Sequence, residues 1–263
     1  EEKRNTWNST VKTYWVASHL IEPDLADGKK YSCRVYCLVS LNSDNELRSY
    51  IYPLKMGYKA YRDYISDQTS VEFNEYERQL TNLDVTKRAL KEENPNWDTS
   101  KIMAEASRKS NFNFDKFIKG KSQIIQDKFN KQLKDLVTLT IEANKIEIKC
   151  TKNKGLGCWQ LLAYDLMLDN KNDLKILEIN TNPGFIGPAK YWGFTTFESF
   201  FDDIFKLTID KNIKAYTYDR QDKDENKWVK IYGPDATPLY MGGGYYSKYL
   251  KYKKKYLELK NLN

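Results

Sequence analysis

The stretch LLAYDLMLDNKNDLKILEIN, residues 161–180, decides the fold class of this chain. Two apolar runs flank a polar segment that is rich in turn-forming residues, and this pattern predicts a hairpin of two antiparallel strands. If Leu168 pairs with Lys175 in that hairpin, Asp165 falls directly opposite Glu178. The predicted register therefore places two carboxylates face to face within otherwise apolar strands.

Asp165 and Glu178 repel each other in that arrangement, and each loses hydration inside an apolar strand. A shared hard cation relieves both costs. Because side chains alternate along a strand, Asn180 lies on the same face as Glu178, whereas Leu177 and Ile179 lie on the other. Two carboxylates and an amide supply oxygen ligands that suit magnesium, which keeps its remaining positions for water and substrate phosphates. The hairpin thus predicts a magnesium site, and a solvated hairpin face is the alternative.

The chain has 263 residues, enough for one large domain or two small ones with a substantial core. It contains no apolar run that could span a bilayer and no N-terminal signal peptide, so we expect no membrane association. From Tyr245 onward six lysines stand against one glutamate and carry +5 of the net charge of +7. Because the remainder is nearly neutral, nucleic-acid binding by the main body is not favoured.

The cysteines and the single histidine exclude several kinds of catalytic site. The spacing of the four cysteines, Cys33, Cys37, Cys150 and Cys158, is not the paired spacing of a zinc site. Cys33 and Cys37 would share one face of a strand, which favours buried free thiols over metal ligands. Reduced thiols and the absence of a secretion signal favour a cytoplasmic protein. His19 lies in an apolar, strand-like run, which favours a packed histidine over a catalytic one. We expect the chemistry to depend on carboxylates, lysines and arginines with a metal.

The rest of the pattern predicts a sheet with helices packed against it. Apolar runs predict three further strands, at 14–21, 31–41 and 47–52. The polar, interrupted segment from Ala60 to Asn113 is typical of loops with short helices, whereas Lys121 to Ala143 shows the spacing of an amphipathic helix. A second helix is expected to begin at Thr195 and to bury an apolar face, namely Phe197, Phe200, Phe201, Ile204 and Phe205.

Four separated blocks, in this order, together resemble the tubulin tyrosine ligase family of ATP-grasp ligases. Residues 30–39, KYSCRVYCLV, are similar to the Lys-Phe-Asp-Ile-Arg block that opens a strand in the family. Residues 79–82, QLTN, look like its His-Leu-Thr-Asn element, and residues 132–137, QLKDLV, like the helix before its metal-binding hairpin. The hairpin itself resembles the family's Leu-Glu-Ile-Asn strand with its Pro-containing loop. The resemblance extends across residues 14 to 190.

The resemblance implies a magnesium and ATP site with a role for each matched residue. Asp165, Glu178 and Asn180 would hold one or two magnesium ions that bridge ATP phosphates. Lys30 would approach the nucleotide phosphates as a catalytic cation. Arg34, the second catalytic cation, would hold a phosphate or the carboxylate of the incoming amino acid, for which its planar, two-pronged geometry is suited.

Further positions would complete the nucleotide site. Thr81 would lie near the nucleotide or the acceptor. Val16, His19 and Leu20 match the hinge strand whose backbone meets adenine. In this family a carboxylate is first phosphorylated by ATP, and an amine then displaces the phosphate to form an amide.

The chain also departs from the family at several of these positions. Ser32 stands where the family has Asp, and residues 17–19 replace a Gln-Lys-Tyr type of hinge. The arginine that the family places after its third strand has no clear match, and Lys55 and Lys59 are the nearest basic candidates. The match begins near the hinge, so we expect the preceding lobe, whose lysine and covering loop close over the phosphates, to be missing.

The expected fold class is α+β, an ATP-grasp-like antiparallel sheet flanked by helices, with the front lobe missing. We expect residues 1–240 to form the C-terminal portion of such a domain, and residues 241–263 to form a basic Tyr/Lys/Leu-rich tail behind a glycine joint. The tail is similar to C-terminal segments common in giant-virus proteins, which implies a viral source.

Three functions fit these features. The resemblance implies an ATP- and Mg²⁺-dependent ligase, or its catalytic half, that joins a free amino acid to a protein acceptor such as tubulin through an acyl phosphate. The alternative is a non-catalytic protein-binding module that keeps the fold and has lost the front lobe. A basic virion or scaffold protein that acts through residues 245–263 is the third reading.

Overall fold

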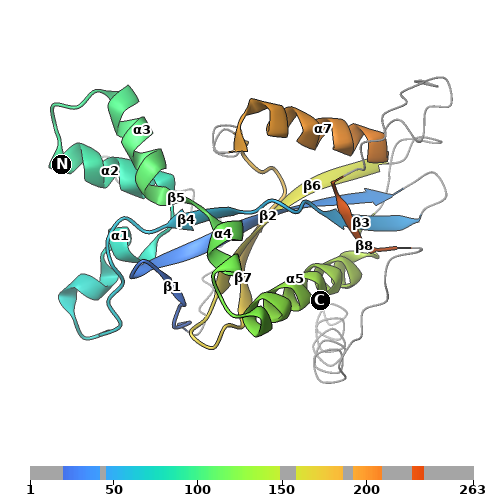
Figure 1. Cartoon of the computed structure of the whole chain (residues 1–263), viewed down its shortest axis with the longest axis horizontal. Coiled ribbons are helices and arrows are strands. Elements are labelled where there is room, and N and C mark those ends of the chain that lie inside the picture. The colour runs from blue at the N-terminus through green and yellow to red at the C-terminus, as the bar shows by residue number, and fades with distance from the viewer. Residues whose placement is uncertain (1–19, 42–45, 149–157, 186–191, 209–226, 234–263) are drawn as a thin grey trace, which may run out of the picture.

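The computed structural model describes residues 20–41, 46–148, 158–185, 192–208 and 227–233. Within this part of the chain, one eight-stranded antiparallel sheet is flanked by helices (Figure 1). This architecture confirms the predicted α+β class. None of the helices in the described ranges is long and apolar enough to cross a membrane.

Strand β2 (Lys29–Leu41) is the centre of the sheet, and every other strand connects to it directly or through one neighbour. One edge of β2 pairs first with β4 and then with β3, and the opposite edge pairs with β6. Each of these three partners pairs in turn with one outer strand. The pairs are β4 (Met56–Lys59) with β5 (Asn111–Asn113), β3 (Leu47–Ile51) with β8 (Val229–Tyr232), and β6 (Cys158–Leu168) with β7 (Leu174–Asn180), while β1 (Leu25–Ala26) pairs with the start of β2.

Side-chain alternation along β2 divides the core into two layers, one on each face of the sheet. The odd-numbered residues Tyr31 to Val39 pack in one buried cluster with α5 (Gln123–Asn144). The even-numbered Tyr36 and Leu38 pack in a second cluster with α7 (Phe194–Thr208). The two helices accordingly cover opposite faces of the sheet (Figure 1).

The predicted elements are largely confirmed, with exceptions at the edges. Strands β2 and β3 and helices α5 and α7 lie within two residues of their predicted starts, and α7 buries Phe200 and Ile204. Phe205 was predicted to be buried and is 42% exposed, so that prediction is wrong. Of the strand predicted at 14–21, residues 14–19 lie outside the described part, and Leu20 and Ile21 are in no strand.

The segment from Ala60 to Asn113 is more helical than its polar sequence indicates. It contains η1 (Val71–Asn74), α1 (Tyr76–Gln79), α2 (Leu83–Glu93) and α3 (Thr99–Ser110), and α4 (Phe114–Lys119) follows. Helices α2 and α3 bury a small cluster of Leu90, Ile102 and Ala106 between them. Asn82 and Asp98 cap the two helices by accepting backbone hydrogen bonds at their N-termini. The predicted short helices are therefore confirmed, and these caps mark where two of them begin.

The cysteines of the described chain differ in their bonding state. Cys33 and Cys37 are buried free thiols on one face of β2, as predicted. Cys158 is disulfide-bonded, so the expectation that all thiols are reduced is wrong for this residue.

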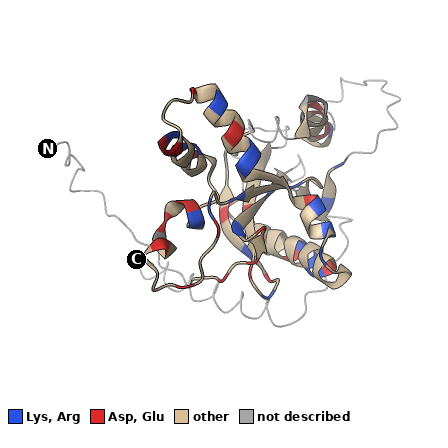
Figure 2. Ribbon diagram, turned by 60° about the vertical axis from the view of Figure 1, so that its left-hand side comes forward, with Lys and Arg blue, Asp and Glu red and all other residues tan. Residues whose placement is uncertain are grey.

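Lys and Arg positions are interspersed with Asp and Glu positions along the drawn helices (Figure 2). The basic tail, residues 241–263, lies outside the described part.

Candidate functional site

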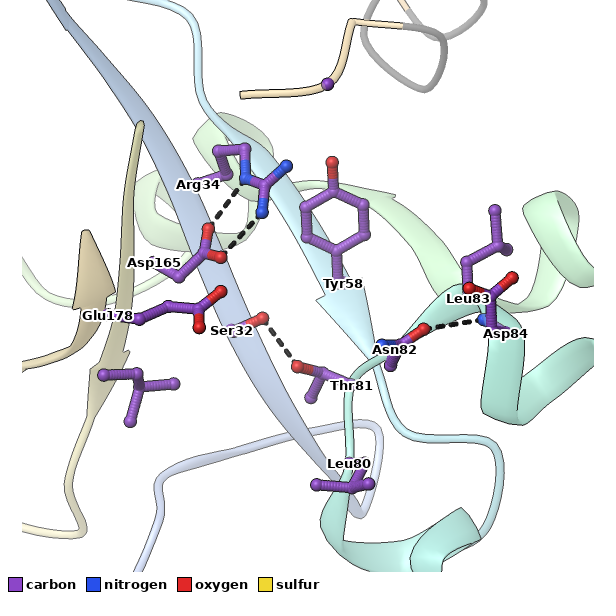
Figure 3. A pocket seen from close by; sticks show the side chains of 12 residues that line it. Ser32, Arg34, Tyr58, Leu80, Thr81, Asn82, Leu83, Asp84, Asp165 and Glu178 are labelled. Atoms are coloured by element: carbon purple, nitrogen blue, oxygen red, sulfur yellow. Dashed lines mark hydrogen bonds and ion pairs between the residues drawn. The ribbon is translucent and has the colours of Figure 1, made fainter. Parts of the chain in front are cut away.

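A pocket of about 640 Å³ lies on the face of β2 that also carries Tyr36 and Leu38, beyond the end of the apolar α7 layer. Charged groups, hydroxyls and leucines line it together (Figure 3). The lining residues are Ser32, Arg34, Tyr58, Leu80, Thr81, Asn82, Leu83, Asp84, Asp165, Leu177, Glu178 and Gly184. The sequence predicted five of them, namely Arg34, Thr81, Asp165 and Glu178 as site residues and Ser32 as an altered neighbour.

Three charged residues form a row across three adjacent strands. Arg34 on β2 lies directly opposite Asp165 on β6, which lies directly opposite Glu178 on β7. Arg34 Nε donates to Asp165 Oδ1 at 2.7 Å, and Nη2 donates to Oδ2 at 2.6 Å. Asn180 Nδ2 donates to Asp165 Oδ2 at 3.2 Å and to Glu178 Oε1 at 3.0 Å. The structure therefore brings together the three predicted metal ligands and one predicted catalytic cation.

The register of the hairpin differs from the predicted one on one side of this row. Leu168 pairs with Leu174 instead of Lys175, whereas Asp165 still lies opposite Glu178. A register shift between Asp165 and Leu166 absorbs the difference. Such a β-bulge adds one residue to one strand, so the pairing on one side of it is shifted by one residue relative to the other side.

Leu177 is the extra residue on β7, and the bulge changes the side of the strand to which it belongs. Its side chain is 46% exposed and lines the pocket. Ile176 and Ile179 pack against the core on the α5 face. The prediction that Leu177 and Ile179 share a face is therefore wrong, because simple alternation does not hold across a bulge.

The two carboxylates occupy different electrostatic environments. Burial raises the pKa of Asp165, and the charge of Glu178 raises it further, while the Arg34 guanidinium opposes both effects. The hydrogen bond from Asn180 lowers the pKa of Glu178, which is more exposed. A close carboxylate pair commonly splits in this way, with the buried member holding a proton more tightly.

The start of β2 meets the segment between α1 and α2 beside this row. The hydroxyls of Ser32 and Thr81 are hydrogen-bonded at 2.7 Å. Lys30 lies two residues earlier on the same face of β2, and its Nζ donates to Gln79 Oε1 at 3.4 Å. Burial lowers the pKa of Lys30. Lys30 does not line the pocket itself, so the structure places it at the margin of the site.

Tyr58 is one of seven lining residues that the sequence did not predict as site residues. It lies opposite Ser32 in the β2–β4 ladder, and Cζ of Arg34 lies 5.6 Å from the centre of its ring. The two lysines proposed as substitutes for the family's arginine are engaged elsewhere, Lys55 with Asp115 and Lys59 with Asp27. Tyr58 shares the pocket face with Ser32 because directly opposed residues lie on one face of a sheet, and only the β2–β4 pairing reveals this.

Of the three predicted adenine contacts, one lies in the described part of the chain. Val16 and His19 lie outside the described residues. Leu20 is described, is 49% exposed and is not part of the pocket lining.

Two comparisons place the chain among known proteins. The model of the tubulin-tyrosine ligase family matches residues 4–217, which includes every residue that lines the pocket. The Probable tubulin polyglutamylase ttll-9 of Caenorhabditis elegans is 26% identical over 188 residues. That alignment covers 69% of this chain and 39% of the relative, so the chain spans well under half of the relative's length.

Proposed function

This chain belongs to the tubulin-tyrosine ligase family, and from that premise we propose that it is an ATP- and Mg²⁺-dependent ligase, or the catalytic C-terminal part of one, that joins an amino acid to a protein tail. The observation that supports this most directly is the row of Arg34, Asp165 and Glu178, with the Asn180 amide reaching both carboxylates. The row combines oxygen donors for a hard cation with a guanidinium for an oxyanion.

The donor set fits magnesium. Two carboxylates and one amide offer only oxygen to a metal, which is the ligand type that Mg²⁺ prefers. Arg34 takes one hydrogen-bond position on each oxygen of Asp165 and Asn180 takes a second on Oδ2, so Oδ1 keeps a lone pair to offer. Burial, and to a smaller extent the charge of Glu178, raises the pKa of Asp165 against the opposing effect of Arg34, and a bound cation would favour the ionised form.

The remaining residues of the site would bind and orient the reactants. Arg34 and Lys30 would hold anionic groups of the nucleotide or the substrates, and the hydroxyls of Ser32 and Thr81 would donate to them. Bound Mg²⁺ and ATP would supply the phosphoryl group that activates a carboxylate, which an amine then converts to an amide with release of phosphate. We retain Val16, His19 and Leu20 as proposed contacts of the adenine.

The acceptor that we propose is a protein tail. Tubulin is the first acceptor to test, because the relative from Caenorhabditis elegans is named for it. The cytoplasm remains the proposed location of the reaction.

The metal and nucleotide site is tested by replacing Glu178 with Gln. We expect ATP with Mg²⁺ to raise the Tm of the parent protein and to raise that of Glu178→Gln much less, because the variant lacks one anionic ligand. Glu92→Gln is the matched control, since Glu92 is exposed on α2 and does not line the pocket. Equal shifts in all three proteins, with and without Mg²⁺, would remove the metal assignment.

The alternative function is a non-catalytic protein-binding module. Its supporting observation is Tyr58, which occupies the pocket wall where the family resemblance leads us to look for a second cation. Radiolabelled glutamate, glycine and tyrosine offered with ATP, Mg²⁺ and purified tubulin separate the two functions. Incorporation of label supports the ligase, whereas nucleotide binding without incorporation supports the module.

A further inference from the structure

The edge of Arg34 formed by Nε and Nη2 is engaged in this structure, although the proposed function requires Arg34 to bind an anion. Its Nε and Nη2 both donate to Asp165, at 2.7 and 2.6 Å. The two side chains are 19% and 12% exposed, so the pair is largely removed from water. A two-pronged bond of this length in a poorly hydrated site is among the stronger ion pairs in proteins. An oxyanion that binds this two-pronged edge of Arg34 must compete with Asp165.

The same ion pair also affects the carboxylates. Asp165 and Glu178 lie opposite each other and share the Asn180 amide, so two acids face one guanidinium. The Arg34 charge therefore compensates part of the negative charge that a bound divalent cation would compensate. A cation with two charges neutralises both acids, whereas the guanidinium neutralises one.

Tyr58 contacts the guanidinium independently of Asp165. Its ring lies beside Arg34 on the side away from Asp165 (Figure 3), at 5.6 Å from Cζ to the ring centre. The face of an aromatic ring attracts a guanidinium. The Tyr58 hydroxyl contacts the Met56 sulfur at 3.7 Å, which is a weak interaction. Arg34 can therefore leave Asp165 and still remain at the pocket wall.

We propose that Arg34 is an internal counter-ion that a divalent cation displaces. Binding of the cation at Asp165 and Glu178 frees the two guanidinium donors, which bind an oxyanion in the pocket while the guanidinium stays against the Tyr58 ring. This inference rests on the proposed function, because it uses the same metal ligands. It adds that the cation and the oxyanion bind cooperatively, with the cation opening the anion site.

Cooperativity of this kind is reciprocal, so it can be measured from the cation side. An oxyanion that binds freed Arg34 must raise the affinity for the cation by the same factor by which the cation raises the affinity for the oxyanion. Coupling between two sites is commonly a factor of about 5 to 150. Removing Arg34 should both abolish this coupling and strengthen cation binding, since the competitor for Asp165 is gone.

The experiment measures Mn²⁺ binding to the full chain by electron paramagnetic resonance of free Mn²⁺, with sulfate as the oxyanion and chloride at matched ionic strength as its control. In the parent protein we expect sulfate to raise the Mn²⁺ affinity at least about fivefold. In Arg34→Met we expect tighter Mn²⁺ binding without sulfate and no effect of sulfate. Arg108→Met is the matched control, because Arg108 pairs with Glu105 on the exposed face of α3.

Two variants of Tyr58 test whether its ring holds the freed guanidinium at the pocket wall. Tyr58→Phe keeps the ring and should keep the sulfate effect, whereas Tyr58→Leu should lose most of it while binding Mn²⁺ as the parent does without sulfate. Circular dichroism establishes that each variant is folded. The parent measurement needs no variant, so it decides the matter even if Arg34→Met fails to fold.

The outcomes separate this inference from the proposed function. Mn²⁺ binding to the parent that sulfate does not strengthen, or weaker Mn²⁺ binding by folded Arg34→Met, overturns the counter-ion role and leaves the metal site in place. Absence of Mn²⁺ binding by the parent overturns the proposed function, and the inference with it.

Discussion

Gly57 permits the close packing that supports the pocket wall at Tyr58. It lies opposite Phe112 in the β4–β5 ladder, and a Cβ at this position would lie 2.3 Å from the Phe112 ring. That ring also contacts Tyr31 and Phe117 at centroid distances of 5.9 and 5.7 Å. Because the ring is enclosed by other rings, it has little room to retreat from an added methyl group.

We therefore expect Gly57→Ala to lower the free energy of unfolding by about 1–3 kcal/mol, the usual cost of overpacking. Gly184→Ala is the control, since nothing lies within 4 Å of the Cβ it would add. Urea denaturation of the two variants and the parent gives the comparison. Equal stability of the two variants would show that Phe112 moves aside at no cost.

The hairpin of β6 and β7 depends on its bulge for the orientation of its apolar residues. Leu177 is the bulged residue and lies at the pocket, whereas Ile179 packs against the α5 face of the core. In a regular strand the two side chains would share one face. The bulge also keeps Asp165 opposite Glu178, although the ladder beyond it is shifted by one residue.

A pair of matched substitutions tests this assignment. Ile179→Gln should lower the free energy of unfolding by about 1–3 kcal/mol, because it places an amide against the core. Leu177→Gln should change it by less than about 0.5 kcal/mol, because this side chain is already half exposed. Thermal or urea denaturation distinguishes the two, and a larger effect at Leu177 would mean that the strand is regular in solution.

At the scale of elements, the sequence was informative wherever apolar residues repeat with a clear period. The spacing in α5 and the apolar runs of β2 and β6 predict those elements, because one period holds along each of them. Helices α2 and α3 bury few apolar residues, so their pattern is weak, and only their caps at Asn82 and Asp98 indicate where they begin. A bulge leaves no sign in the apolar pattern, so the position of Leu177 could not be predicted.

The part of the site that comes from one hairpin could be predicted from the sequence, and the part that depends on strand pairing could not. Asp165, Glu178 and Asn180 come from one hairpin, so local spacing brings them together. Tyr58 reaches the same pocket only through the pairing of β2 with β4, which depends on the whole sheet. The cation–π contact between Tyr58 and Arg34 therefore became apparent only in the assembled fold.

At the scale of the whole molecule, the segment after β7 joins the pocket to the core layer under α7. Tyr36 of the α7 layer donates from its hydroxyl to the backbone oxygen of Gly184 at 3.0 Å, and its ring stacks on Phe185. Phe200 contacts both rings, at centroid distances of 5.4 and 6.1 Å. The segment after β7, which contributes Gly184 to the pocket lining, is thus held by the aromatic cluster under α7.

Phe129 provides the matched position on the opposite face, where it is buried in α5 and packs against Phe114 at 5.4 Å. We expect Phe200→Leu and Phe129→Leu each to lower the free energy of unfolding by about 1–3 kcal/mol, since each removes part of a fully buried ring. Only Phe200→Leu should also weaken the binding of ATP with Mg²⁺, because it loosens the cluster that holds Gly184. Calorimetric titration well below the Tm of each variant measures the two affinities on folded protein. Equal weakening in both variants would mean that affinity follows overall stability, whereas a loss confined to Phe200→Leu would mean that the α7 layer shapes the pocket.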